Sequence, residues 1–407
     1  MVVDKLYYST HPFINAVSAG FSFDEQTVKD AVRRIYERKF DVSTDIDEEI
    51  FNETWNIFNK AVDEGFGAKI YSDPDFDFYQ ELRYNNAVFS AFRTHRLQND
   101  IAAQLLDENG RLKSFEKFSN DVQSITDHNV RHWLRTEYDT AILRAHQAAD
   151  WRQFEQVKDI LPNLRWMTTT SVTPDLVHKR YWEARLTLPQ DHSFWNEHRP
   201  GDRWNCKCSL EATDDPVQGT QVIDEDNQPK PDRGLDNNPG VDAKLFSDTH
   251  PYFSNSYVDR KKLLPVMDKM ITEISRKDVR EHFRKNPPKE NYKVKEGPIA
   301  YLNISYQDIR TITGKPHKYG YYRNTFLYYL PEIFKEMNYL GWSLDIKNKT
   351  IPGHGDAERW HYYSFMLNNE RSFLVVKENN LGGCRVHAIQ DNDHFKVIKI
   401  TNPWKKP

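Results

Sequence analysis

The segment Trp195–Leu210, WNEHRPGDRWNCKCSL, restricts the fold of this chain more than any other stretch. It combines a Pro-Gly turn and two tryptophans with Cys206 and Cys208, two of only three cysteines in the protein. Tryptophan is mostly buried in folded proteins, and thiolates are soft metal ligands. A segment so rich in both residue types either stabilises the fold or forms a metal-binding or active site. Its role decides how the first two thirds of the chain are interpreted.

The composition predicts a globular protein of two or three domains. The 407 residues are 38% hydrophobic and 13% aromatic, so each domain can bury a core. No apolar run of about eighteen residues occurs and the start, MVVDKLYYSTHPF, lacks a signal core, so neither a membrane partner nor Sec export is expected. Because two of the three cysteines are separated by a single residue, we expect no disulfide framework and a reducing folding compartment.

The net charge of −4 conceals an asymmetry between the two ends of the chain. Residues 258–407 carry 27 Lys and Arg against 17 Asp and Glu, whereas the preceding residues carry 29 against 43. An acidic body joined to a basic tail indicates different partners for the two parts. A polyanion such as nucleic acid is favoured by the tail, although solvated faces explain part of the excess.

Residues 22–160 show the period of amphipathic helices. Two shorter helical patterns precede longer ones at about 78–107 and 129–153. Regular apolar faces and charged outer faces indicate an all-helical platform without a catalytic pattern. The period ends before residues 165–212, where Trp, Pro, His and Cys predominate. An irregular segment is therefore expected to close this mainly α-helical module.

These changes of character divide the chain into four expected parts. They are a helical module at 1–213, an Asp/Asn/Pro/Gly-rich arm or linker at 214–255, a basic helical connector at 256–295 and a small α+β domain at 296–407. In the last part, a strand at 299–305 and a helix at 322–340 precede an antiparallel meander. Its strands are expected at 362–367, 372–378, 384–390 and 394–401, separated by Asn, Gly and Asp turns.

Cys206 and Cys208 form a candidate metal-ligand set with His178. Completed by His192 or His198, the set would make a closed tetrahedral zinc site of the structural type. The alternative is that the thiols pack beneath the neighbouring tryptophans and that the histidines are hydrogen-bonded core residues. A catalytic zinc site would need an open position and a carboxylate base, and no HExxH-like arrangement is present. The available acidic residues are Asp191, Glu197 and Asp202.

Residues suited to RNA cleavage gather in the last hundred positions. They are Lys315 and His317 before the predicted helix, Arg323 and Asn324 at its start, His361 and Tyr363 on one strand face, and His387 on a later strand. Cleavage needs a base for the 2′-hydroxyl, an acid for the leaving 5′-oxygen and a cation for the phosphorane. His317 and His361 can share the proton transfers, while Lys315 or Arg323 holds the phosphate. The alternative is that these are ordinary core residues.

Several motifs of the first two thirds occur together in one known family. They are RTEYDTAILRAHQAADW at Arg135–Trp151, LRWMTTT at Leu164–Thr170, His178, PGDRWNCKCSL, and the later Gly234–Pro239 and His250–Phe253. In combination they resemble the Mu F-like phage head morphogenesis (minor capsid) family over about residues 20–255, with Lys207 in place of the usual Arg. The resemblance implies a structural protein of the virion head, present in few copies near the portal. Its partners would be the portal, other head proteins and packaged DNA, with assembly in the bacterial cytoplasm.

A second resemblance covers about residues 296–407. A Lys-Pro-His motif before a helix, followed by Trp-His on the first strand of a meander, is similar to the phage barnase–EndoU–colicin–RelE-like nuclease domains that are often appended to Mu F-like proteins. It implies a toxin-like, metal-independent endoribonuclease that needs no cofactor and acts on host RNA after entry with the DNA. His317 and His361 match the family's polar positions best, followed by Lys315 and Asn324. The RNA contacts would then come from Arg323, Tyr363 and His387.

A purely structural protein is the alternative function. In that case the C-terminal domain binds the portal, another head protein or nucleic acid without catalysis. Some members of the nuclease-like group bind RNA and have lost activity, so the resemblance alone leaves both readings open.

Overall fold

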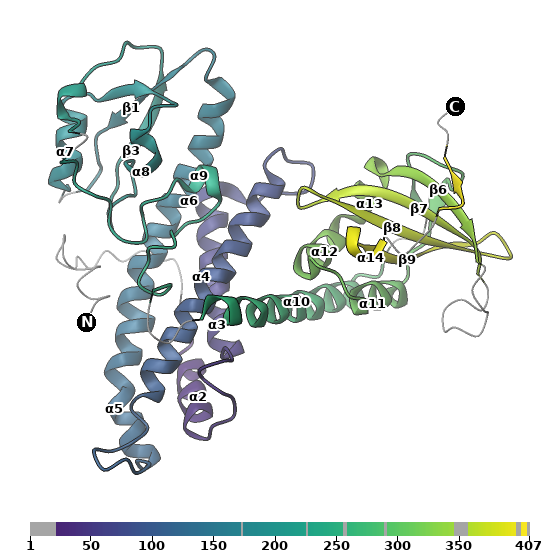
Figure 1. Ribbon diagram of the computed structural model, residues 1–407, viewed down its shortest axis with the longest axis horizontal. Coiled ribbons are helices and arrows are strands. Elements are labelled where there is room, and N and C mark those ends of the chain that lie inside the picture. The colour runs from purple at the N-terminus through teal and green to yellow at the C-terminus, as the bar shows by residue number, and fades with distance from the viewer. Residues whose placement is uncertain are drawn as a thin grey trace. The chain divides into compact units, whose positions relative to one another are not determined.

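The structure, a computed structural model, describes residues 22–171, 174–224, 227–254, 259–288, 291–345, 357–395 and 400–404. The chain divides into two compact units. The first comprises Met1–Lys69 and Glu81–Met267, and the second comprises Ile70–Gln80 and Asp268–Pro407. Figure 1 shows long helices in the first unit and a broad antiparallel sheet in the second.

Long helices build most of the first unit. They are α2 (Glu25–Tyr36), α3 (Glu48–Val62), α4 (Phe76–Ala102), of which the part from Glu81 belongs here, α5 (Phe115–Asp127) and α6 (Leu134–Val157). Asp24, Asp47 and Ser114 begin three of them by accepting a backbone N–H of the first turn. The predicted helical platform is confirmed. None of the described helices has the length and the apolar character that a membrane span requires.

The helical backbone after α5 is longer than the sequence predicts. A π-helical turn at His128–Trp133 joins α5 to α6, so helical structure continues from Phe115 to Val157 rather than over 129–153 alone. A further π-helical turn, Asp63–Gly67, ends α3. Gly65 of this turn lies against α6, where a Cβ atom would come within 2.4 Å of the Ile142 carbonyl oxygen. A glycine is therefore required for the close approach of these helices.

A small antiparallel sheet closes the first unit, where the sequence predicts an irregular segment. Its strands, in the spatial order β2-β1-β3, are β1 (Asn163–Met167), β2 (Thr187–Pro189) and β3 (Ser209–Thr213). The helices α7 (Leu176–Glu183) and α8 (Phe194–Glu197) lie between the strands in the sequence. Leu164 and Trp166 alternate inward from β1 into a core with Trp195 and Leu210. Strands of three to five residues are too short for a clear alternating pattern in the sequence.

The predicted arm or linker is a docked arm in its described residues. It contains the turn η3 (Thr220–Val222) and the short helix α9 (Pro239–Asp242), which lies beside α6 in Figure 1. A Cβ atom at Gly240 would come within 2.4 Å of Trp151 Cβ. Tyr252, fully buried, donates its hydroxyl to Glu137 of α6 over 2.7 Å. Glu137 belongs to the Arg-Thr-Glu sequence, and it also pairs with buried Arg93 at 2.6 Å.

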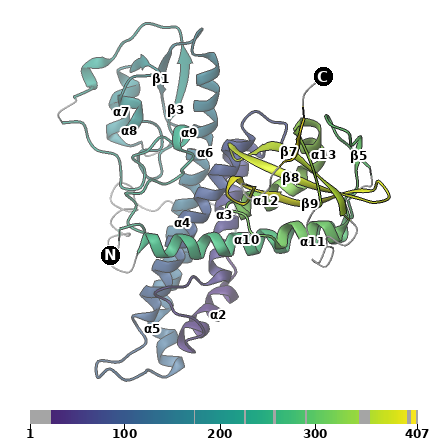
Figure 2. The ribbon, with the colours of Figure 1, turned by 45° about the vertical axis from the view of Figure 1, so that its right-hand side comes forward.

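The helices of the second unit lie against one another and against the sheet. They are α10 (Arg260–Lys285), of which the part from Asp268 belongs here, α11 (Tyr306–Gly314), α12 (Gly320–Phe326) and α13 (Leu330–Glu336). Arg280 Nε on α10 donates to Thr313 Oγ1 at the end of α11 over 2.8 Å. α11 contacts β9 and α12 contacts β7 (Figure 2). Tyr71 and Phe76, from the early segment of this unit, pack against Phe326.

The sheet of the second unit has five antiparallel strands, which confirms the predicted meander. In the spatial order β10-β6-β7-β8-β9, they are β6 (Asn338–Leu344), β7 (Ala357–Leu367), β8 (Glu370–Asn379), β9 (Cys384–Gln390) and β10 (Asn402–Pro403). Asn368 and Asn369 form the β7–β8 turn with φ angles of 51° and 57°. Asparagine tolerates this left-handed conformation, so the two residues favour a tight hairpin. A separate two-stranded sheet pairs β4 (Tyr292–Lys293) with β5 (Tyr301–Leu302).

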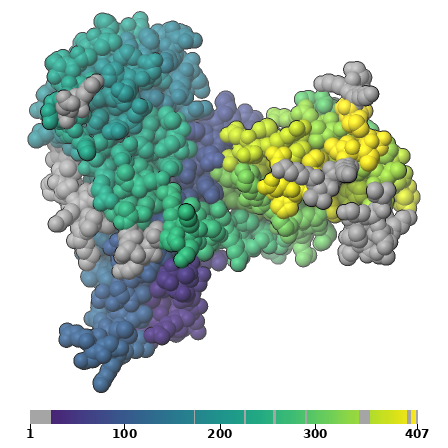
Figure 3. Space-filling model, in the orientation of Figure 1, coloured from purple at the N-terminus to yellow at the C-terminus, as the bar shows by residue number. Residues whose placement is uncertain are grey.

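The boundaries of several predicted elements in this unit are wrong. The helix expected at 322–340 is divided into α12, the turn η4 (Leu327–Tyr329) and α13, and the sequence then enters β6. Pro331 lies in the first turn of α13, where proline begins a helix but cannot continue one. The strand expected at 299–305 is only β5. Of the strand expected at 394–401, residues 394–395 belong to α14 (Asn392–Phe395) and residues 396–399 lie outside the described chain. The last described residues of the unit lie at its surface in Figure 3.

Candidate functional site

Three ligand-type side chains meet in the first unit. His178 lies on α7, and Cys206 and Cys208 lie just before β3. His178 Nδ1 is 3.3 Å from Cys206 Sγ and 3.7 Å from Cys208 Sγ. All three side chains are buried, and their ligand atoms lie within 4.8 Å of one another. The group can bind a metal ion, and it consists of the three residues that the sequence predicts.

Local backbone geometry brings the two thiols together. Asn205 adopts the left-handed conformation with a φ of 62°, and the N–H of Cys208 donates to Cys206 Sγ over 3.4 Å. Asp175 caps α7 by accepting the N–H of His178, which fixes the start of the helix that carries the imidazole. Lys207, between the two cysteines, points to solvent. Lys207 therefore lies outside the buried group.

Asp202 contacts His178 on the side of the ring away from the thiols. Its Oδ1 lies 2.5 Å from His178 Nε2, and the carboxylate is almost completely buried. Burial by itself would lower the pKa of His178, but the charge of Asp202 raises this pKa well above its usual value. Burial likewise opposes ionisation of Asp202, yet His178 holds the pKa of that carboxyl well below its usual range. Because Nε2 is bonded to Asp202, Nδ1 faces the thiols.

The two histidines proposed as a fourth ligand have other partners. His192 Nδ1 accepts the N–H of Phe194 over 3.1 Å, and His198 Nδ1 lies 3.4 Å from Asp202 Oδ2. Within the described residues, the closed four-ligand set is therefore not assembled from these side chains. The predicted packing under tryptophan is observed for Trp195, which shares the core with both thiols. Trp204 instead stacks on Phe246 of the arm.

A second group of polar side chains lines an open cleft of about 500 Å³ in the second unit. His361 Nε2 lies 2.8 Å from Glu378 Oε2 on β8, and its Nδ1 lies 2.9 Å from the Tyr339 hydroxyl on β6. Arg359 is opposite Glu378 in the β7–β8 register, with Nη1 3.8 Å from the same carboxylate oxygen. Tyr301, 57% exposed, is also part of the lining. An imidazole, a carboxylate and a guanidinium therefore face one solvent-accessible space.

Arg359 and Glu378 are functional candidates that the sequence analysis missed. Arg359, His361 and Tyr363 lie at alternate positions of β7, so the Arg-x-His spacing was a usable signal for a shared face. Glu378 joins them only through the pairing of β7 with β8, which includes a register shift between Ala357 and Arg359. Strand register is determined by the packed face and the turn rather than by a local motif. The sequence alone therefore could not select this carboxylate.

The predicted site residues Arg323 and Asn324 are structural rather than part of the cleft. Arg323 is 1% exposed and donates to the Lys315 carbonyl over 2.6 Å. Asn324 is completely buried and donates to Thr272 O and Ser275 Oγ of α10, each over 3.0 Å. These bonds hold α12 to α10 and to the end of α11. Asn324, predicted as catalytic, and Arg323, predicted as RNA-binding, therefore do not line the cleft of His361.

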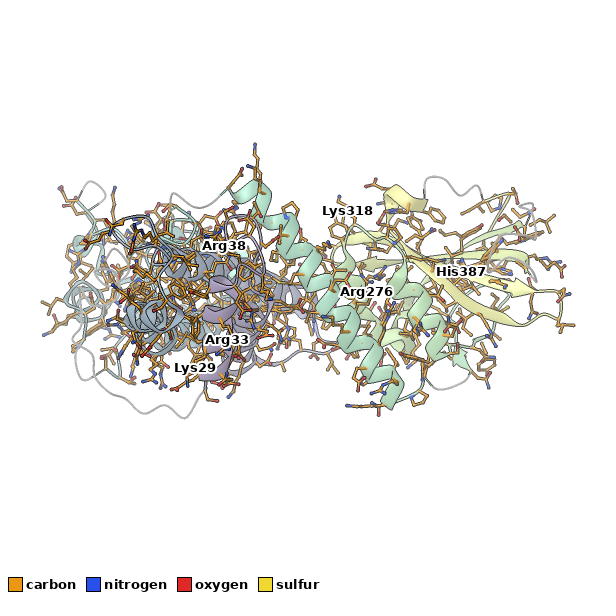
Figure 4. All side chains as sticks on the ribbon, turned by 90° about the horizontal axis from the view of Figure 1, so that it is seen from below. Lys29, Arg33, Arg38, Arg276, Lys318 and His387 are labelled. Carbon is orange, nitrogen blue, oxygen red and sulfur yellow. The ribbon has the colours of Figure 1, made fainter. Side chains whose placement is uncertain are left out.

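Tyr363 and His387 do not line the cleft either. Tyr363 is completely buried, with its ring centroid 4.9 Å from that of Tyr339. His387 is labelled on the sheet in Figure 4, and it packs edge-on against Trp360 at a centroid distance of 4.9 Å. Trp360 and His361 are adjacent on β7 and point to opposite faces. His387 is therefore on the face away from His361.

His317 and Lys315 also lie outside the lining of the cleft, so the structure does not bring His317 together with His361. His317 Nδ1 accepts the N–H of Tyr319 over 3.0 Å. Burial, followed by the charge of Arg323, lowers the pKa of His317 to about 4. Burial lowers the pKa of Lys315 to about 8. A neutral, enclosed His317 fits a packing role beside α12 better than a proton-transfer role.

We expect His317 to make the stability of the protein depend on pH. Its folded pKa of about 4 lies below the unfolded value of 6.5, so the unfolded chain binds more protons between these values. The stabilising contribution is complete above about pH 6.5 and is lost as pH falls through about 4. A shift of this size is worth on the order of 3 kcal/mol.

The measurement is the free energy of unfolding in urea at about pH 7.5 and about pH 4.5, for the wild type and for His317→Gln. The variant should lose less stability between the two pH values. Equal losses in the two proteins would show that His317 is protonated in the folded state, contrary to its burial.

No protein-family model, curated protein or solved structure matches this chain. Its fold and sites define a two-unit protein with a helical first unit and an α+β second unit. The first unit carries a buried thiol–imidazole group that can bind a metal. The second carries an open cleft with groups suited to acid–base chemistry.

Proposed function

We propose that the cleft at His361 cleaves RNA through attack of a ribose 2′-hydroxyl on the adjacent phosphate. The observation that supports the proposal is the meeting of His361, Glu378 and Arg359 in one open cleft. A base, an acid and a cation are the groups that this transphosphorylation needs. All three come from the chain itself, so the proposed reaction uses no cofactor.

Each of the three side chains has one role in the reaction. Glu378 takes the proton of the ribose 2′-hydroxyl while the 2′-oxygen forms its bond to phosphorus. The bond from phosphorus to the 5′-oxygen breaks, and His361 Nε2 gives its proton to that leaving oxygen. Arg359 stabilises the charge on the phosphorane oxygens. The products are a 2′,3′-cyclic phosphate and a free 5′-hydroxyl.

Tyr339 is the positioning residue of this site. Its hydroxyl lies 2.9 Å from His361 Nδ1, on the opposite side of the ring from Glu378. Burial raises the pKa of Tyr339, so the hydroxyl stays neutral, and its oxygen can accept the Nδ1–H of protonated His361. Protonated His361 then gives its Nε2 proton to the leaving oxygen and becomes neutral.

The charge of the second unit supports RNA as the substrate. The unit's residues, 70–80 and 268–407, include 24 Lys and Arg against 19 Asp and Glu. An excess of positive charge increases the rate of encounter with a polyanion and its affinity. Tyr301 adds an exposed aromatic side chain at the cleft, on which an unpaired base can stack.

For the first unit we propose an assembly role in a phage head, near the portal. The support is the resemblance of its motifs to those of Mu F-like head proteins, and Trp151, Trp166, Cys206 and Cys208 from these motifs share one core. The proposed partners are the portal, other head proteins and packaged DNA. The protein would assemble into the virion head in the bacterial cytoplasm, and the nuclease would reach host RNA when the DNA enters the next cell.

In the proposed assembly unit, the His178, Cys206 and Cys208 group holds a structural zinc ion. Two thiolates and an imidazole form a donor set that suits zinc. Burial of all three side chains suits an ion that stabilises the fold rather than one that meets a substrate.

Incubation of the full-length protein with a single-stranded RNA, without added divalent metal, tests the nuclease proposal. Fragments ending in a 2′,3′-cyclic phosphate are expected, together with no cleavage of an oligonucleotide of the same sequence made of DNA. The reason is that the nucleophile is the 2′-hydroxyl. Cleavage of both substrates would contradict the mechanism. Binding of RNA without cleavage would instead favour the purely structural alternative, in which the second unit is a docking module.

A further inference from the structure

Asp202 lies between the metal-binding group and the arm of the first unit. On one side its Oδ1 is 2.5 Å from His178 Nε2. On the other side its backbone carbonyl accepts the N–H of Asp232, in the arm, over 2.9 Å. The Asp232 carboxylate in turn accepts the N–H of Trp204 over 3.0 Å. The short loop that carries Asp202, Trp204 and Cys206 is therefore hydrogen-bonded both to His178 and to the arm at Asp232.

The distances from the imidazole nitrogen to the two sulfur atoms fit a tetrahedral zinc ion. Bonds of about 2.1 Å to nitrogen and about 2.3 Å to sulfur, at tetrahedral angles, place the two ligand atoms about 3.6 Å apart. The distances from His178 Nδ1 to the sulfur atoms of Cys206 and Cys208 are 3.3 and 3.7 Å. Both lie within about 0.3 Å of the ideal edge, so an ion can be accommodated by small side-chain adjustments.

We propose that Asp202 is the positioning residue of a zinc centre formed by His178 Nδ1, Cys206 Sγ and Cys208 Sγ, and that this centre fastens the arm to the small sheet. The proposal rests on the structural zinc proposed for the assembly unit. A carboxylate on the far nitrogen of a ligand histidine fixes the ring orientation and increases the basicity of the metal-bound nitrogen. Without Asp202, the ring could turn and the ligand nitrogen would lose its fixed direction.

The connection to the arm follows from the same loop. Three ligating or positioning side chains, from Asp202 to Cys208, occur within seven residues. Zinc binding restricts this loop, and the restricted loop presents the Asp202 carbonyl and the Trp204 N–H to Asp232. Loss of the metal should therefore release the arm around Asp232 before it unfolds α6.

The first experiment measures zinc in the full-length protein. One zinc per chain is expected for the wild type, and Asp202→Asn should weaken zinc affinity by about 10- to 100-fold in competition with a chromogenic chelator. Asp202→Glu, which keeps the carboxylate, should recover part of the affinity. The cobalt-substituted wild type should show thiolate-to-cobalt charge-transfer bands, and these should be altered in Asp202→Asn. In zinc-loaded wild type, nitrogen NMR should show His178 bound through Nδ1 and protonated at Nε2, a result that requires no variant to fold.

Asp232→Ala is the matched control, because it removes the carboxylate that accepts the Trp204 N–H and leaves the ligands intact. It should bind zinc with wild-type affinity but lose protection of the arm against trypsin at Arg233. The wild type should lose the same protection when a chelator removes the zinc.

The possible outcomes separate the linked proposals. Less than about 0.1 zinc per chain in undamaged wild type would overturn the zinc site itself. Zinc binding with unchanged affinity in Asp202→Asn, or His178 bound through Nε2, would overturn the positioning role and leave the structural zinc intact. An arm that stays protected in the metal-free wild type would overturn the fastening role. None of these results bears on RNA cleavage.

Discussion

Replacing Glu378 by Gln should lower kcat for RNA cleavage by about 10²- to 10⁴-fold, the usual contribution of a general base. The amide is close in size to the carboxylate but cannot accept the 2′-hydroxyl proton. It can still accept a hydrogen bond from His361 Nε2, which lies 2.8 Å from the native carboxylate. The fold of the cleft should therefore survive, and KM should change much less than kcat. Initial rates of cyclic-phosphate formation provide the measurement.

His361→Ala should reduce kcat to a similar extent. The effects of the two changes should not add, since the residues act as a pair. His387→Ala is the matched control, because His387 packs against Trp360 on the other face of the sheet. It should retain wild-type activity. Full activity in both Glu378→Gln and His361→Ala would remove these residues from the mechanism. Loss of activity in the control alone would move the site to the opposite face.

Replacing Arg144 by Met should destabilise the protein by about 3–5 kcal/mol, because several buried acceptors lose their donor at a cost of roughly 1–3 kcal/mol each. Arg144 lies on α6 and is completely buried, and burial lowers its pKa to about 10. Its guanidinium donates to the carbonyls of Leu245 over 2.5 Å and Gly201 over 2.6 Å, and to Asn237 Oδ1 over 2.5 Å. Removing it leaves these buried acceptors without their donor.

Urea unfolding of the full-length protein, with the change in midpoint and slope, measures this loss. Arg152→Met on the same helix is the control, because Arg152 pairs with Glu155 at the surface, over 3.2 Å. It should change stability by less than about 1 kcal/mol. Arg144→Lys should not recover the wild-type value, because one ammonium cannot reproduce the planar set of donors. Equal stability of Arg144→Met and the wild type would show that the arm docks without this side chain.

Most helices of the first unit could be predicted because their information is local. The apolar period and the cap at Asp24 are properties of adjacent residues, whereas α5, which Ser114 caps, was not predicted. The hairpin at Asn368 and Asn369 was predictable for the same reason, since two asparagines favour the left-handed turn. The single helix predicted at 322–340 was wrong. An apolar period continued past Pro331, but the proline begins a new helix and the following residues pair as a strand.

The candidate sites show a similar division. His178, Cys206 and Cys208 were selected from the sequence because soft ligands are rare and concentrated in one segment. Their partner Asp202 was considered only as a base for catalytic zinc, and its actual contact depends on how α7 packs against the loop before β3. At the other site, His361 was identified, but His317, Lys315 and Asn324 were grouped with it from their closeness in sequence. Their packing separates them from the cleft that His361 lines.

The sequence by itself determined the helical platform, the antiparallel meander and the thiol–imidazole ligand set, because turn chemistry, side-chain periodicity and ligand type act over a few residues. Only the tertiary structure placed Glu378 beside His361 and Asp202 behind His178. Both contacts join separate elements, and their geometry depends on strand register and on the packing of a helix against a loop. The segment Trp195–Leu210 thus showed its two cysteine ligands in the sequence. The contact of its Asp202 with His178 is seen only in the folded chain.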